Sequence, residues 1–184
     1  KNDKVKLNLK SIFYKLMAKF QNLLFKIYLN KRKIKNNILI LGNLRQTLPL
    51  LKKLKENKNN KIIRGGENLG RGLFTKNCDH YITFKEFSNY KIKKIIEQEK
   101  INLINKWNKI KNKLTLFNVL ESNYRKIILE VFLTLIKYIE IIKYIGNEID
   151  VVVTHNEIIK FEKTIVKSSN NIKIPTITMI EGFL

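Results

Sequence analysis

The residues that could do chemistry are few in this sequence, and their spacing does not assemble a reaction centre. Cys78, Asp79 and His80 are consecutive and could each bind a metal ion. A zinc site needs about four ligands, and the 184 residues contain one cysteine and two histidines in all. We therefore expect no metal site and no other cofactor.

The second histidine, His155, stands beside Asn156 directly after an apolar run. We interpret it as a neighbour of a helix cap, because a catalytic base must also reach a nucleophile and be oriented by a third group. Asp150 and Glu162 are too far apart in the sequence for an acid/base pair to be inferred from their spacing. The sequence therefore predicts neither an enzyme nor a small-molecule substrate.

The net charge is the feature that indicates a partner. The chain has 37 Lys and Arg against 15 Asp and Glu, which gives a net charge of +22. A free protein with this excess repels itself and binds polyanions, and nucleic-acid phosphates are the commonest counter-charge. An A+T-rich coding sequence would enrich lysine, but it would also enrich glutamate, and acidic residues are scarce. The composition favours a polyanionic partner, with codon bias as the alternative.

Two further compositional features narrow the class of protein. The lone Cys78 excludes an intramolecular disulfide framework and fits a reducing compartment. Lysines interrupt every apolar run before it reaches the roughly 18 residues of a membrane span, so we expect no span.

The spacing of apolar residues predicts alternating helices and strands. Ile38 to Leu41 is a continuous apolar run, as expected of a strand that is buried on both faces of a parallel sheet. We expect strands at 38–41, 62–63, 149–153 and 174–180, and helices over 5–30, after 47, twice between 84 and 145, and over 156–169.

Residues of particular types mark where these helices begin and end. Thr47 is expected to cap a helix that has Pro49 in its first turn, where a missing N–H is not needed. Asn118 and Glu121 have the spacing of a capping box, and Gly146 stands where a C-terminal cap belongs. The two long helices would then form an antiparallel hairpin.

The helix expected over 5–30 is amphipathic. Its apolar residues recur at three- and four-residue steps, with Lys15 and Lys19 between them. Such a stripe favours packing on the protein core. The alternative is a helix that lies on a membrane surface, which also has a basic polar face.

Strands that alternate with helices predict an α/β fold with a parallel sheet and right-handed crossovers. We divide the chain into three parts. Residues 1–83 hold the N-terminal helix and the first part of the α/β domain, 84–146 form an inserted helical hairpin, and 147–184 complete the α/β domain.

Four stretches of the sequence resemble one known family. Residues 38–46 are similar to a strand that ends in Gly-Thr-x-x-Gln, with Gly42 and Gln46 kept and Asn43 in place of Thr. Residues 64–75 resemble an Arg-Trp-x-x-Gly-Thr-Leu-Thr-Asn loop, but the Trp of that loop is absent from this sequence. They also contain four glycines, so an ordinary flexible loop is the alternative to an RNA contact.

The two later stretches are similar to the same family. Residues 114–150 resemble its second hairpin helix followed by a Pro-Asp strand start, with Ile149 in place of Pro. Residues 162–167 and 174–177 resemble its Glu-x-x-Ala-Val-Lys and Ile-Pro-Val-Ile pattern. In this order, the features resemble the small-subunit ribosomal protein two family (the S-two family). The family's early Gly-His…Trp-Asn-Pro and late Pro-Gly-Asn-Asp segments are missing, so their contacts are not carried over.

The resemblance implies a flavodoxin-like or Rossmann-like parallel sheet flanked by helices, with an inserted antiparallel coiled-coil hairpin. It implies a structural constituent of the small ribosomal subunit that binds rRNA and neighbouring ribosomal proteins and supports translation. The divergence suggests a mitochondrial ribosome, with another organellar or a bacterial cytoplasmic ribosome as the alternative. The candidate RNA contacts are basic residues in loops and near strand ends, namely Lys31, Arg32, Lys33, Lys35, Arg45, Arg64, Arg71 and Lys76.

Two other interpretations remain open. Residues 150–182 also resemble the end of the acceptor half of a two-domain nucleotide-sugar glycosyltransferase, where Ile-Pro-x-Ile leads to Gln-His-Gly. Here Ile180-Glu181-Gly182 lacks the Gln and the His, and that fold explains neither the hairpin nor the charge. The third interpretation is a peripheral membrane protein held by residues 5–30.

Overall fold

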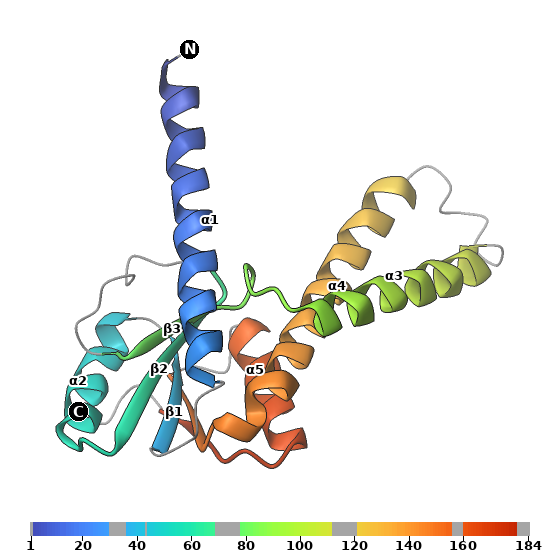
Figure 1. Ribbon diagram of the computed structural model, residues 1–184. Coiled ribbons are helices and arrows are strands. Elements are labelled where there is room, and N and C mark those ends of the chain that lie inside the picture. Colours follow the sequence, from blue (N-terminus) through green and yellow to red (C-terminus); the bar gives the residue numbers. More distant parts are fainter. Residues whose placement is uncertain are drawn as a thin grey trace.

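One sheet of parallel strands lies at the centre of the computed structural model, which describes residues 2–29, 36–42, 44–68, 78–111, 121–155 and 160–179 (Figure 1). The strands within these ranges are β1 (Asn36–Leu41), β2 (Asn60–Gly66), β3 (His80–Thr83), β4 (Val151–Thr154) and β5 (Thr176–Thr178). The helices are α1 (Asn2–Leu29), α2 (Leu44–Glu56), α3 (Tyr90–Lys111), α4 (Glu121–Ile145) and α5 (Lys160–Asn171), and a 3-10 turn, Gly146–Glu148, follows α4.

The central strand β1 is buried on both faces, as its continuous apolar run predicts. Leu39 belongs to the apolar cluster on one face of the sheet and Ile40 to the cluster on the other. Ile38 is paired with Ile62 of β2 on one side and with Val151 of β4 on the other, and all strand pairs are parallel. The predicted α/β fold with a parallel sheet is therefore confirmed.

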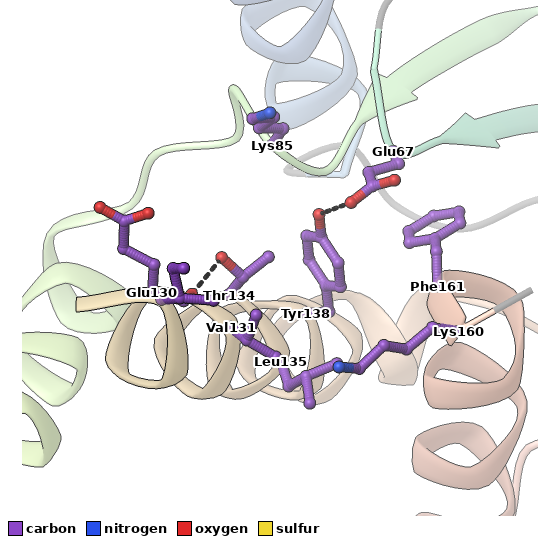
Figure 2. A pocket seen from close by; sticks show the side chains of 10 residues that line it. Glu67, Lys85, Glu130, Val131, Thr134, Leu135, Tyr138, Lys160 and Phe161 are labelled. Atoms are coloured by element: carbon purple, nitrogen blue, oxygen red, sulfur yellow. Dashed lines mark hydrogen bonds between the residues drawn. The ribbon is translucent and has the colours of Figure 1, made fainter. Parts of the chain in front are cut away.

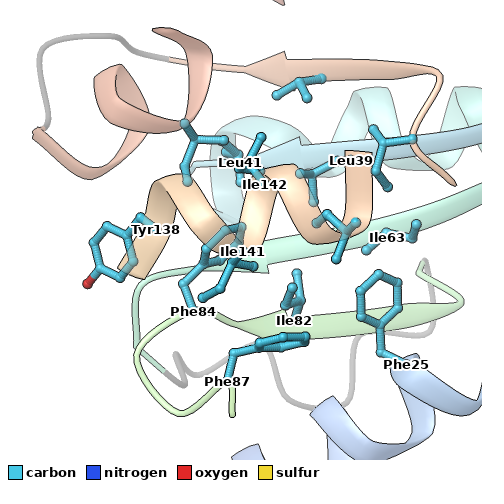
Figure 3. Close-up of a cluster of buried hydrophobic side chains, with 14 of the residues drawn as sticks. Phe25, Leu39, Leu41, Ile63, Ile82, Phe84, Phe87, Tyr138, Ile141 and Ile142 are labelled. Carbon is cyan, nitrogen blue, oxygen red and sulfur yellow. The ribbon is translucent and has the colours of Figure 1, made fainter. Parts of the chain in front are cut away.

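Two layers of helices enclose this sheet. On one face, Phe25 of α1, Ile141 of α4 and Ile165 of α5 bury their side chains in one large cluster (Figure 3). On the other face, Leu51 of α2 packs against Ile40 in a smaller cluster. The larger cluster is the main core.

The strand order is β3-β2-β1-β4-β5. When the short edge strand β3 is set aside, the other four follow the order 2-1-3-4 of flavodoxin-like sheets. The sequence did not predict β3, since its four residues, His80–Thr83, are too few to show a period. The chain runs outward from β1 on one side and returns to β4 on the other, so the strand order reverses between β1 and β4.

The helices α3 and α4 occupy the region between β3 and β4 where a hairpin is expected. They contact one another, and in Figure 1 they spread apart toward the ends farther from the sheet. Ile127, Val131 and Phe132 of α4 stay exposed, whereas a tight coiled coil would bury such residues. Asn118 and the connection at 112–120 lie outside the described residues. The antiparallel coiled coil stays a prediction.

The orientation expected for the N-terminal helix is wrong. Leu16, Phe20 and Leu23 of the apolar stripe are exposed, while Ala18 and Asn22 on the opposite side are buried. The side with Ala18, Asn22 and Phe25 faces the body, because α1 packs along the β3 edge, where the Asn22 amide binds the backbone of Thr83. A period in the sequence reveals a stripe but not what covers it.

Two expected helix ends also differ from the structure. Thr47 does not cap α2, because this helix begins at Leu44 and Pro49 lies inside it. Gly146 does not adopt the left-handed conformation of a helix cap, since Gly42 is the glycine with positive φ in the described chain. A Cβ at position 146 would lie 2.5 Å from Cδ1 of Ile172, so close packing requires this glycine.

Candidate nucleic-acid interface

A row of lysines lies on the outer surface of α5. Lys160, Lys163 and Lys167 recur at three- and four-residue steps and are all exposed, so they share one side of the helix. Phe161 and Ile165 on the opposite side pack into the main core. Lys163 and Lys167 offer their ammonium groups to this surface and suit contact with phosphates, whereas the Lys160 side chain also lines a cavity beside α4.

The acidic residue of α5 does not lie in this row. Glu162 is 5% exposed, its Oε2 has no hydrogen-bond partner, and burial raises the pKa of its carboxyl group. Sequence reasoning placed its candidate contacts in loops and missed the lysine row. The spacing of lysines at 160, 163 and 167 was visible in the sequence and could have identified it.

Most of the basic residues predicted to contact RNA cannot be placed. Lys31, Arg32, Lys33, Lys35, Arg71 and Lys76 lie outside the described residues. Arg45 belongs to the first turn of α2, where the structure describes the backbone. The RNA contacts of these seven residues therefore stay a prediction.

Arg64, the remaining candidate, faces the protein interior. It is 6% exposed, and its Nη2 donates a hydrogen bond of 3.2 Å to the carbonyl oxygen of Gly42. Its Nη1 is buried without a partner, and burial lowers the pKa of the guanidinium. As placed, Arg64 holds the end of β1 and does not present its charge to solvent.

Gly42 and His155 meet where the strand order reverses. Gly42 has a φ of 112° and directly follows β1, while His155 directly follows β4. A Cβ at position 42 would lie 3.0 Å from the Cβ of His155. Open α/β sheets commonly bind ligands at this position. The close approach of His155 explains why position 42 holds a glycine. The contact between the two residues does not by itself make a catalytic site.

A cavity of about 460 Å³ opens beside the carboxyl ends of β2 and β3 (Figure 2). Glu67 follows β2 and accepts a 2.7 Å hydrogen bond from the hydroxyl of Tyr138 on α4. Burial, together with that bond, raises the pKa of Tyr138, so the phenol remains protonated. Glu130, Lys85 and other charged side chains of both signs line the cavity. Such a mixture does not select an anion.

The Cys78-Asp79-His80 segment has a structural role in the described chain. Oδ2 of Asp79 accepts a 2.9 Å hydrogen bond from the N–H of Ile62, and its Oδ1 lies 3.1 Å from Nζ of Lys61. The His80 ring stacks on Tyr28 with centroids 4.2 Å apart, and burial lowers the pKa of this histidine. Among the described residues, no three Cys, His, Asp or Glu gather in a group that could hold a metal.

Comparisons with known proteins add no relative. No protein-family model matches the chain, and neither the curated proteins nor the solved structures contain a match. Within the described ranges, each helix is too short or too polar to cross a membrane. The S-two resemblance therefore stays a prediction that rests on the sequence.

Proposed function

We infer that this chain is a structural constituent of a small ribosomal subunit, of the S-two type, that binds rRNA through its phosphates. The observation that carries the proposal is the excess of 37 basic over 15 acidic residues on a folded body. In a free protein this excess of positive charge causes self-repulsion. In a protein embedded among phosphates, the phosphates neutralise the charge and the contacts are favourable. The parallel sheet with long helices between β3 and β4 is compatible with the S-two resemblance.

The α5 row supplies a described surface for these contacts. Because Lys160, Lys163 and Lys167 stand on one side of a rigid helix, their positions are set by the core on its other side. Lysine contacts to phosphates position a protein without selecting a base sequence, and helical RNA is recognised mainly by shape and backbone. Neighbouring ribosomal proteins would contact the surfaces that RNA leaves open.

The location follows from the same proposal. Divergence from the S-two pattern favours a mitochondrial ribosome. Fractionation of cells should place the chain with mitochondrial small subunits after washing in moderate salt. Its recovery with cytosolic ribosomes would contradict the location but not the ribosomal role.

The central experiment measures binding of the full chain to a small-subunit rRNA transcript over a salt series. We expect the affinity to fall steeply with salt. Replacing Lys160, Lys163 and Lys167 together by Ala should reduce the slope of log affinity against log salt by about 2, since each phosphate contact contributes about 0.7 to 0.9. Neutralising Lys31, Arg32 and Lys33 should also lower incorporation into the subunit.

The matched control is the triple variant Lys52→Ala/Lys55→Ala/Lys58→Ala, which removes the same charge from exposed positions on and after α2. A slope that changes equally in both variants would show that the α5 row is no specific site. Equal affinity for rRNA and for heparin would show that the charge binds any polyanion, and it would refute the rRNA proposal.

A further inference from the structure

The outward side of α1 carries an exposed apolar seam. Phe13, Leu16, Phe20, Leu23 and Ile27 (the α1 seam) are between 49% and 59% exposed. They follow one another at steps of three, four, three and four residues. This spacing fits helices that supercoil around a partner helix, and over four steps it also fits the period of an ordinary amphipathic helix.

The α1 seam cannot turn inward, because the other side of α1 is already fixed to the body. Phe25 lies in the main core, and Asn22 binds the Thr83 backbone through two hydrogen bonds. Five large side chains that are half exposed leave roughly 500 Å² of apolar surface, near the upper limit for the largest patch on a monomer. Such a patch indicates a binding surface.

We propose that the α1 seam binds a helix of another protein, and that this helix has its own 3.5-residue apolar repeat flanked by acidic side chains. This proposal does not rest on the proposed function. The proposed rRNA contacts are made to phosphates by charged side chains, whereas the residues of the α1 seam are apolar. Regular steps of three and four place knobs that fit the holes between four residues of a facing helix. Ile12 and Leu24 on either side of the α1 seam are 49% and 45% exposed, so a lipid surface, which needs a broad apolar face, is the alternative that the vesicle experiment below tests.

Charge determines which kind of helix fits. The α1 sequence contains six lysines and one aspartate, a net charge of 6 − 1 = +5. Lys19 is exposed and lies directly before Phe20, at the position that flanks the α1 seam. Two copies of this helix side by side would repel, whereas acidic flanking residues attract and orient a partner. Charge therefore disfavours a second copy of this chain.

The experiment uses the full chain and two labelled three-heptad peptides with identical apolar seams. One peptide has Glu at the flanking positions and the other has Lys. Fluorescence anisotropy should show that the Glu peptide binds at least about tenfold more tightly than the Lys peptide. The Phe20→Ser/Leu23→Ser variant should lose this binding by at least tenfold, because it removes the centre of the α1 seam.

The control variant is Ile127→Ser/Phe132→Ser, which removes two exposed apolar side chains of α4 and should bind the Glu peptide like the wild type. Equal binding by the α1 variant would overturn the proposal, as would failure of both peptides to bind. So would self-association, seen by sedimentation, that the α1 variant abolishes. Flotation with phosphatidylglycerol vesicles that depends on the α1 seam, without peptide binding, would assign it to a membrane instead.

Discussion

Asn22 makes two hydrogen bonds between α1 and the backbone of the edge strand β3. Its Nδ2 donates a 3.0 Å hydrogen bond to the carbonyl oxygen of Thr83, and its Oδ1 accepts a 2.9 Å hydrogen bond from the Thr83 N–H. One donor and one acceptor are what a further strand would offer at this edge. Asn22 therefore satisfies a strand edge that would otherwise be left unpaired under α1.

We predict that Asn22→Leu destabilises the fold by about 2 kcal/mol. Thr83 is fully buried, so the substitution leaves two buried backbone groups without partners, at about 1–3 kcal/mol each. Burial of the leucine side chain returns about 1.5–3 kcal/mol. The apolar pattern of α1 alone would predict the opposite sign, because leucine fits a helix better than asparagine.

The assay is equilibrium unfolding in urea, where this loss should lower the midpoint by about 1 M. Hydrogen exchange should also accelerate at the Thr83 amide. Asn108→Leu is the matched control, since Asn108 is exposed on α3, and it should change the free energy of unfolding by less than about 0.5 kcal/mol. If Asn22→Leu behaves like this control, the two hydrogen bonds do not hold α1 to the sheet.

Three further substitutions test the core and two carboxylates, the buried Glu162 and the partly buried Asp79. Gly65→Ala should cost about 1–3 kcal/mol in urea unfolding, because the new Cβ would lie 2.6 Å from Cδ2 of Leu41; an unchanged midpoint would contradict this packing. Burial raises the pKa of Glu162 above 4.5, so the folded state binds the proton more tightly and stability falls as the pH rises through and above that value. Glu162→Gln should therefore stabilise the protein near about pH 8 and lose its advantage below pH 4.5, and a pH-independent difference would refute the assignment. Burial alone would raise the pKa of Asp79, but the Ile62 N–H and Lys61 hold it below 3.8. Its stabilisation is therefore present above pH 3.8 and lost as the pH falls further, and the deficit of Asp79→Asn in urea unfolding should shrink in acid.

The sequence predicts the sheet better than it predicts the helices. Ile38 to Leu41 can be assigned as a central strand because burial on two faces leaves no polar position in the run. The alternation of elements then implies parallel pairing, and β1 is indeed paired with β2 and β4. The edge strand β3 escapes this reasoning, because its Thr83 backbone is bonded by Asn22, which is 61 residues away in sequence.

The candidate interface could be predicted only as a charge and not as a surface. The excess of lysine is a property of composition, whereas a surface requires that several side chains point in one direction. On α5 the helix geometry provides that direction from the sequence itself, since residues 160, 163 and 167 lie within one face. For basic residues in loops, such as Lys31 and Arg71, no repeat period determines where the side chains point.

The two faces of α1 place different demands on the same sequence. The inner face must satisfy the β3 edge, which requires asparagine at position 22 and small size at Ala18. The same face buries Phe25 in the main core, and the residues of the α1 seam lie on the outer face. A helix assigned from periodicity alone would be rotated by half a turn, which would bury Phe20 against β3 and leave the Thr83 backbone without Asn22. The observed orientation keeps both hydrogen bonds to Thr83 and the burial of Phe25 in the main core, and it leaves the α1 seam exposed.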